Sequence, residues 1–354
     1  MVKPLVGIVI PTINRPEFVI RQLSFYARTG GRIGIYIGDG SEGEGLEKVA
    51  AACERFSKQL KIVHLRLPGS SDVEAERALV KAVEEPFACL LGDDDFFIPS
   101  SLERCADFLT GNPDYAIALG KAALFQLSSE ALYGDIVSLV PYNQRSLESS
   151  TASERLLDYF YRSFATHFSV HRTDNFRKEM EAIKDVNDRA IREILSSALA
   201  IVHGKAKQLD RLYLVREDHA KRYLQADVYD ILTHPRWQSA YQILFDVLTN
   251  EVAEKDDIPL ERARDVVKQG FWAYTARALN YKWNNRYGRS SASLRQRLSK
   301  VAVIANSWHK MRSFIPAERH RISLHALLRR SSKYNDDFAL FHDFITGQVE
   351  SREQ

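Results

Sequence analysis

The sequence predicts an α/β protein in which a mostly parallel sheet, covered by helices on both faces, precedes a helical C-terminal region. Short apolar runs alternate with segments of helical periodicity near the N-terminus. Polar side chains follow these apolar runs, at the positions where strands should end. Beyond residue 225 nearly every segment has helical periodicity, interrupted by prolines and glycines.

Each strand predicted near the N-terminus is followed by a helix. The runs are short and rich in β-branched residues, as in the buried strands of parallel sheets. The expected strands are 6–10, 33–37, 61–65 and 87–91. The helices expected between them are 17–28, 46–59 and 73–83. This alternation predicts a Rossmann-like sheet, and such sheets bind ligands beyond the carboxyl ends of their strands.

Further along the chain the alternation is looser. The expected elements are a helix at 153–161, a strand at 166–172, a helix at 188–203 and a strand at 211–216. Gly204 supports the end of the helix at 188–203, because glycine commonly terminates helices. We place a boundary near residue 225, which divides the chain into a domain at 1–225 and a helical region at 226–354.

Bulk composition excludes several classes of protein. With 45% hydrophobic and 27% charged residues, the 354-residue chain is typical of globular proteins. A net charge of +3 and the lack of a recognition motif argue against a nucleic-acid partner. Cys53, Cys89 and Cys105 have no CxxC spacing and predict buried, reduced thiols. We find no signal-like or membrane-spanning run and expect a cytoplasmic protein.

Three consecutive acidic residues, Asp93, Asp94 and Asp95, directly follow the strand expected at 87–91. Burying carboxylates beside a strand is unfavourable unless a cation or hydrogen-bond donors compensate. Hard divalent cations prefer such oxygen ligands and often share them with substrate phosphates. The triplet therefore predicts a metal site that holds a diphosphate.

Two further polar clusters follow neighbouring strands. The loop Pro11-Thr12-Ile13-Asn14-Arg15-Pro16 comes after the first strand, and Gly38-Asp39-Gly40-Ser41 ends the second. Since the carboxyl ends of parallel strands meet at one edge, we expect both clusters to lie beside the acidic triplet.

The order of these motifs resembles the GT-A fold glycosyltransferases, particularly the large inverting family 2. The likeness covers residues 5–97, extends more loosely over 165–220, and leaves out the C-terminal region. It implies a metal-dependent transfer of a sugar, with inversion, from a UDP- or GDP-linked donor to a hydroxyl acceptor. The expected setting is surface polysaccharide or glycoconjugate synthesis, with a glycan or lipid-linked acceptor and 1–225 as the catalytic domain.

The resemblance assigns the donor nucleotide to eight residues near the strand ends. Asp39 is similar to the acid that hydrogen-bonds the nucleobase, and Arg77 lies where many relatives have an arginine near the diphosphate. For Arg77, an exposed ion pair is an equally open alternative. The candidate nucleotide-sugar-binding residues are Pro11, Thr12, Asn14, Arg15, Asp39, Arg77, Asp93 and Asp94.

The acidic triplet resembles the DXD element of the same family. There, the first acid commonly touches the ribose and the last binds the metal. A late histidine completes the metal shell in some relatives, and His219 matches it, although an ordinary structural histidine is the alternative. The candidate ligands for Mn²⁺ or Mg²⁺ are therefore Asp93, Asp95 and His219.

Transfer to a hydroxyl also requires a base, usually Asp or Glu. The helix at 188–203 lies where relatives carry this residue. Glu193 is the first candidate, because it opens the apolar helical run, and Asp188 is the second. An exposed helix charge is the alternative for Glu193.

The C-terminal region is basic, with aromatic residues between the charges. A solvated helical face is the simplest interpretation. Attachment to the inner face of an anionic membrane, or to a lipid-linked or acidic acceptor, is the sharper one. We expect the helical region to shape the acceptor site, pair subunits or touch a membrane. The basic residues are Lys282, Arg286, Arg289, Arg295, Arg297, Lys300, Lys310, Arg312, Arg319, Arg321, Arg329, Arg330 and Lys333. The aromatic residues are Trp283, Tyr287, Trp308 and Phe314.

Two rival functions fit the same sheet. A sugar nucleotidyltransferase also needs a metal and carboxylates, but it usually carries a glycine-rich phosphate loop, which residues 11–15 do not form. A catalytically silent carbohydrate- or membrane-binding protein is the second rival.

Overall fold

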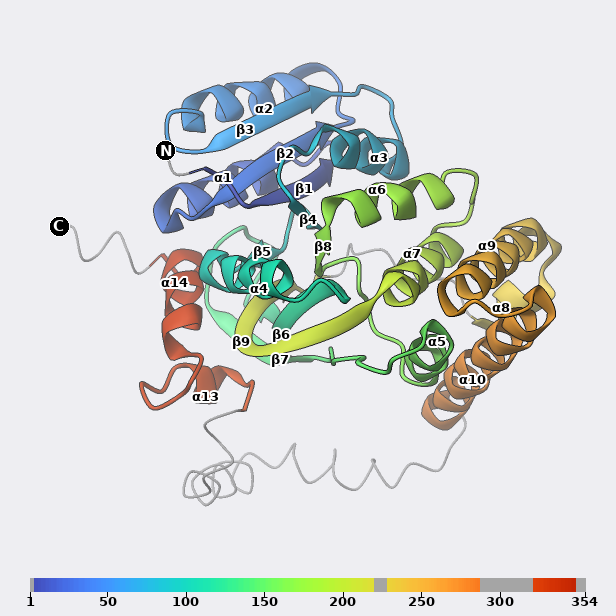
Figure 1. Cartoon of the computed structure of the whole chain (residues 1–354). Helices are drawn as coiled ribbons and strands as arrows, with labels where there is room; N and C mark the ends of the chain where they lie inside the picture. Colours follow the sequence, from blue (N-terminus) through green and yellow to red (C-terminus); the bar gives the residue numbers. More distant parts are fainter. Residues whose placement is uncertain (1–2, 220–227, 287–320, 348–354) are drawn as a thin grey trace.

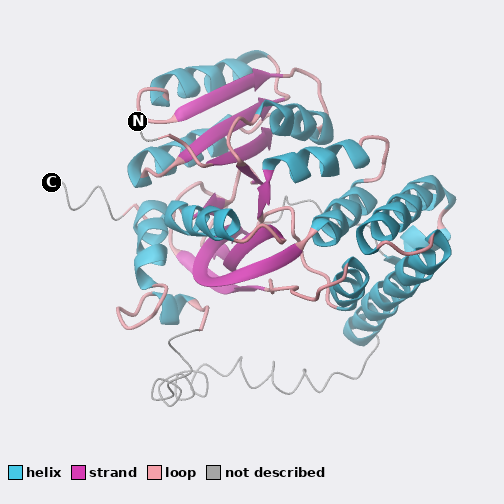
Figure 2. Cartoon of the chain, in the orientation of Figure 1, coloured by secondary structure: helices cyan, strands magenta, loops and turns pink. Residues whose placement is uncertain are grey.

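The computed structural model describes residues 3–219, 228–286 and 321–347. Within them, nine strands form one sheet, with helices packed on both sides (Figure 1; Figure 2). The strand order is β3-β2-β1-β4-β8-β6-β9-β5, and β7 pairs with β6. The basic and aromatic residues of segment 287–320 lie outside the described residues.

The first half of the sheet is parallel and follows the sequence prediction. Its strands are β1 (Val6–Thr12), β2 (Ile33–Asp39), β3 (Lys61–Arg66) and β4 (Phe87–Leu90). The intervening helices are α1 (Pro16–Thr29), α2 (Gly43–Phe56) and α3 (Asp72–Ala82). β2 is buried along its whole length, as expected for a strand covered on both faces. Cys53, Cys89 and Cys105 are buried and free, as predicted.

The second half of the sheet is mixed, so the prediction of a mostly parallel sheet is wrong. The strands are β5 (Phe96–Phe97), β6 (Tyr115–Leu127), β7 (Ile136–Tyr142), β8 (Val170–Arg172) and β9 (Lys205–Glu217). β8 runs antiparallel to both β4 and β6, whereas β6 and β9 are parallel. β6 and β7 pair antiparallel because a short connection joins them, whereas parallel neighbours require a long crossover.

Helices enclose this half of the sheet. They are α4 (Pro99–Gly111), α5 (Ala152–Tyr161), α6 (Thr173–Ala182) and α7 (Arg189–His203). The strand expected at 166–172 is shorter than predicted, because the Ser169 N–H donates to the Thr166 carbonyl and closes a turn. This turn holds His167 and Phe168.

Beyond residue 228 the described residues are helical, as predicted. The elements are α8 (Val228–Thr233), the 3₁₀ turn Pro235–Trp237, α9 (Gln238–Asp256) and α10 (Leu260–Arg286). α9 packs against α5 and α7, α10 packs against α5, and α8 packs against α10. α13 (Leu324–Leu327) and α14 (Asn335–Ile345) lie at the opposite side of the molecule (Figure 1). No helix in these ranges is long and apolar enough to cross a bilayer. The boundary near residue 225 falls outside the described residues and stays a prediction.

Local signals fix the ends of the helices that carry the polar residues of the cavity. Pro16 occupies the first turn of α1, where its missing N–H has no helical partner to lose. Ser71 and Glu74 form a reciprocal capping box at the start of α3. Asp188 caps α7 by accepting a hydrogen bond from the Ile191 N–H.

α14 packs aromatic rings against those of α1, β5 and β6. The Phe341 ring lies 5.4 Å from that of Phe96 and 4.9 Å from that of Phe125. The Phe344 ring lies 5.3 Å from that of Phe25. These edge and tilted arrangements are the favourable ones for aromatic pairs. The C-terminal helix is therefore part of the sheet's own core.

This packing predicts different effects for two adjacent residues of α14. Phe341 is fully buried and Leu340 is 52% exposed. We expect Phe341→Ala to lower the free energy of unfolding by about 3–5 kcal/mol, because it leaves a cavity among aromatic rings. Leu340→Ala, the control, should change it by less than about 0.5 kcal/mol. Urea unfolding measures both, and equal effects would contradict the proposed packing.

Candidate functional site

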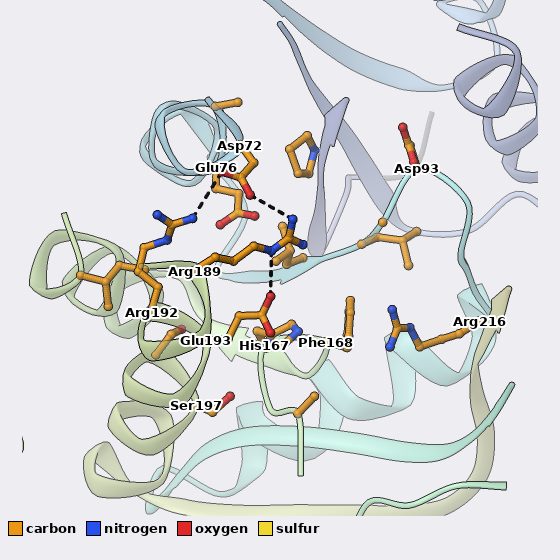
Figure 3. A pocket seen from close by; sticks show the side chains of 18 of the residues that line it. Asp72, Glu76, Asp93, His167, Phe168, Arg189, Arg192, Glu193, Ser197 and Arg216 are labelled. Atoms are coloured by element: carbon orange, nitrogen blue, oxygen red, sulfur yellow. Dashed lines mark hydrogen bonds and ion pairs between the residues drawn. The ribbon is translucent and has the colours of Figure 1, made fainter. Parts of the chain in front are cut away.

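A cavity of about 800 Å³ opens at the carboxyl ends of β1 and β4. Figure 3 shows Asp93 and Arg216 at one side of it, and Arg189 and Glu193 at the other. The polar residues that line it include Thr12, Arg15, Asp72, Glu76, Asp93, Asp94, His167, Arg189, Arg192, Glu193, Arg216 and His219.

Asp93 and Asp94 are held by cations and by the first loop. Thr12 Oγ1 donates to Asp93 Oδ2 at 2.8 Å. The Arg15 guanidinium spans both acids, 2.5 Å from Asp93 Oδ1 and 3.1 Å from Asp94 Oδ2. His219 Nε2 lies 2.7 Å from the same Asp94 oxygen. The loop after β1 and the end of β9 thus converge on the acidic triplet, as the sequence predicts for the first loop.

Asp95 faces the protein interior and is fully buried. Arg216 Nε donates to its Oδ2 at 2.7 Å, and the Glu217 N–H donates to its Oδ1 at 3.0 Å. The Gln22 side chain donates to the backbone carbonyl of Asp95 at 2.7 Å. Both carboxylate oxygens therefore have protein donors, and Asp95 is not among the lining residues.

The three neighbouring acids differ in proton affinity. Burial raises the pKa of Asp93 to about 7 and that of Asp95 to about 6, although Arg15 and Arg216 respectively oppose these shifts. Burial also disfavours ionisation of Asp94, but the hydrogen bond from His219 and the charge of Arg15 outweigh it and lower the Asp94 pKa. The same hydrogen bond raises the pKa of His219. Asp94 is thus the most acidic carboxyl of the triplet.

The cavity offers donors for a divalent cation that is shared with a ligand. Among the described residues, no three carboxyl, imidazole or thiol groups are arranged to hold a metal ion by themselves. Mg²⁺, however, is usually bound by one or two carboxylates together with substrate phosphates and water. Asp94 and Asp93 line the cavity with His219 and fit that mode of binding. Asp95 lies behind them.

Asp39 and Asn14 make hydrogen bonds within the protein and do not line the cavity. Asp39 is fully buried; its Oδ1 accepts the Ser41 N–H at 2.9 Å, and its Oδ2 lies 3.5 Å from His64. Asn14 adopts a φ of 55°, a left-handed conformation that asparagine tolerates, and its N–H donates to Ser41 Oγ. Neither Asp39 nor Asn14 is among the residues that line the cavity, whereas Pro11 is.

Arg77 points away from the cavity. Its Nη2 lies 3.1 Å from Glu181 Oε2 of α6, in an exposed ion pair. The preceding residue, Glu76, lines the cavity instead. Burial, together with the negative charge of Asp72, raises the pKa of Glu76 to about 8.

Of the two candidate bases, Glu193 and Asp188, one lines the cavity and the other does not. Glu193 lines the cavity and accepts a hydrogen bond from Arg189 Nε at 3.0 Å. Asp188 is the N-cap of α7 and also accepts the indole N–H of Trp237, and it does not line the cavity. Only Glu193 of this pair therefore faces the space in which a ligand would bind.

Several residues of the cavity were not predicted as site residues. Glu76 and Asp72 come from α3, Arg189 and Arg192 from α7, and Arg216 from β9. The helices and the end of β9 were predicted. Their relative placement depends on the mixed half of the sheet, which no local pattern indicates.

Comparison with known proteins supports the fold. No protein-family model matches the chain, and no curated protein matches it. Among solved structures, Staphylococcus aureus TarS 1–349 is similar over 98% of this chain and 92% of that one, with 12% identity and a TM-score of 0.53. The complex with UDP-GlcNAc has 12% identity, a TM-score of 0.54 and the same coverage. The UDP complex has 14% identity and a TM-score of 0.52, over 99% of this chain and 91% of that one. At such identity the likeness shows a shared fold.

The pairing of Asp95 with Arg216 makes a testable prediction. Removing one partner of a buried ion pair leaves an uncompensated charge. We expect Arg216→Ala to lower the free energy of unfolding by roughly 3 kcal/mol at pH 8. The loss should be smaller at pH 5, because Asp95 can then take up a proton and become neutral. Arg66→Ala, which breaks an exposed pair with Glu47, is the control. A loss that does not depend on pH would contradict this interpretation.

Proposed function

We propose that this chain is a glycosyltransferase that moves a sugar from a nucleoside diphosphate donor to a hydroxyl acceptor. One observation carries the proposal: a single cavity has Asp93 and Asp94, both paired with Arg15, on one side and Glu193 on the other. The cavity lies at the strand ends where such sheets bind ligands. UDP-GlcNAc and UDP, bound in structures of the same fold, support a UDP-linked donor.

The triplet side of the cavity would receive the diphosphate. Arg15 and Arg216 bring positive charge to this side and can make charge-assisted hydrogen bonds to phosphate oxygens. Thr12 and Arg15 tie the first loop to Asp93. These contacts pre-arrange the loop against which a nucleotide would pack.

A divalent cation would be held by Asp94 with His219 and Asp93. Mn²⁺ or Mg²⁺ bound there would neutralise charge on the departing diphosphate. Asp95 would act indirectly, because it holds Arg216 beside the cavity.

Glu193 would remove the proton of the acceptor hydroxyl. A base across the cavity from the diphosphate fits a single displacement, in which the acceptor attacks the sugar from the side opposite the leaving group. Such a reaction inverts the anomeric centre. Asp188 would fix the start of the helix that carries this base.

The acceptor and the cellular setting remain predictions. A glycan or lipid-linked acceptor, a role in polysaccharide synthesis, a cytoplasmic location and a membrane contact all rest on the sequence. Two of the basic residues are engaged in local contacts: Lys333 pairs with Asp210, and Arg329 contacts His325.

The experiment that tests the function combines binding with turnover. Thermal shifts of the chain would be measured against a panel of UDP- and GDP-sugars with and without Mn²⁺, followed by assays of nucleoside diphosphate release. Stabilisation and release of UDP would support the proposal. Release of pyrophosphate from a nucleoside triphosphate would favour a nucleotidyltransferase. Binding of carbohydrate without turnover of any donor would favour the silent protein.

The role of Glu193 makes a prediction about rate. Glu193→Gln should lower the rate of transfer by about 10²–10⁴-fold, because general-base assistance is lost. The Kd for the donor should stay within about twofold, since the substitution keeps the shape of the side chain. Glu181→Gln is the control, because Glu181 is an exposed acid outside the cavity. An unchanged rate would move the base elsewhere.

The role of Asp94 makes a prediction about the metal. Asp94→Asn should weaken UDP binding in the presence of Mn²⁺ by about tenfold or more, because a carboxylate ligand is removed. Without metal, the affinity should stay the same or rise, since one negative charge has left the diphosphate side. Isothermal titration calorimetry measures both conditions, with Asp107→Asn as the control. A full Mn²⁺ effect in the variant would exclude Asp94 as a ligand.

A further inference from the structure

We propose that Arg189 is a positioning residue that orients the Glu193 carboxylate and is itself anchored by Asp72. This inference rests on the proposed function, because it deepens the role of Glu193 as the base. It assigns a task to two residues that neither the motifs nor the resemblance indicate.

A single guanidinium joins the two acids. Arg189 Nε donates to Glu193 Oε1 at 3.0 Å, and Arg189 Nη1 lies 3.3 Å from Asp72 Oδ2. Figure 3 shows the three side chains one after another, with Arg189 between Asp72 of α3 and Glu193 of α7. The other Asp72 oxygen lies 3.3 Å from Arg192 Nη2. The Asp72 carboxylate of α3 therefore forms ion pairs with both arginines of α7.

Asp72 is a firm anchor because the start of α3 is fixed. It is the first residue of the helix and lies between Ser71 and Glu74, which form the capping box. Its Oδ1 also accepts the Val73 N–H at 2.8 Å. Asp72, on a helix that packs against the parallel half of the sheet, thus holds Arg189 of α7, a helix that packs against the mixed half.

Stability does not explain this arrangement well. The side chains of Asp72, Arg189 and Glu193 are 40%, 44% and 26% exposed, and exposed ion pairs contribute little to folding. Along α7 the arginine precedes the glutamate by four residues, which is the less favourable order for a helical pair. A role in placing Glu193 accounts for the geometry better.

The chemistry follows the logic of a base that is oriented by a third group. A hydrogen-bonded cation restricts rotation of the carboxylate and favours its ionised form, which is the form that accepts a proton. Arg189 would supply both effects in one contact.

Other titratable and charged groups act on Glu193 from the elements around it. The nearby His167 is neutral at pH 7, because burial lowers its pKa to about 4. The phenols of Tyr142, Tyr159 and Tyr274 remain neutral, since burial raises their pKa values. Besides Arg189, the groups around Glu193 are Asp72, Glu76, Tyr142, Tyr159, His167, Arg192 and Tyr274.

The test is the pH dependence of UDP release from a UDP-sugar, with water or a supplied glycan as acceptor. A base must be ionised to act, so activity rises with pH through its pKa. Removing the adjacent positive charge should therefore move the acid limb of kcat to higher pH. For Arg189→Gln we expect a shift of about one pH unit and roughly a tenfold lower kcat, with the donor KM within about twofold.

Two further variants separate orientation from charge. Arg189→Lys keeps the positive charge but lacks the planar fork that spans two acids, so the acid limb should return toward its normal position while kcat stays low. In the double variant Arg189→Gln/Glu193→Gln, the rate should equal that of Glu193→Gln alone, because a positioning residue has no further effect once the base is gone. Arg32→Gln, on an exposed arginine that pairs with Glu103 and Asp107, is the control.

An unmoved acid limb, or losses that multiply in the double variant, would overturn the inference while leaving the proposed function intact. If the unaltered chain turned over no nucleotide sugar under any condition, the proposed function would fail and this inference with it.

Discussion

The structure depends on the neutralisation of three adjacent carboxylates at the end of a buried strand. Desolvating such a triplet is unfavourable unless positive charge and hydrogen-bond donors surround it. Here the donors to the carboxylates come from two separate parts of the chain: Arg15 from the first loop, and Arg216 and His219 from the end of β9 and just beyond it. The need to stabilise the triplet thereby ties β9 and the first loop to the loop after β4.

This arrangement also defines the two walls of the cavity. The parallel half of the sheet supplies the triplet and α3, and the mixed half supplies α7. β8 pairs with both β4 and β6 and so joins the halves. Asp72 of α3 forms ion pairs with two arginines of α7, so ion pairs also join the two walls at the cavity. The facing walls therefore carry different chemical groups, an arrangement that suits the proposed displacement.

Features encoded locally could be predicted from the sequence. The first four strands were predicted because each is a contiguous apolar run, and the acidic triplet because it directly follows one of them. The mixed sheet could not be predicted, since β8 pairs antiparallel with β4 and β6, which lie far from it along the chain. The same limit hid Arg216, whose partner Asp95 lies 121 positions away. Arg77 was assigned by its place in a motif, whereas the turn of α3 directs it toward Glu181.

The position of α14 has a consequence for biosynthesis. A ribosome delivers the chain from its N-terminus, and domains generally begin to fold in that order. The rings of Phe341 and Phe344 close a core whose other members, Phe25 and Phe96, emerge far earlier. Those early rings must therefore stay without these partners, exposed or shielded by a chaperone, until the segment that carries Phe341 and Phe344 has been synthesised.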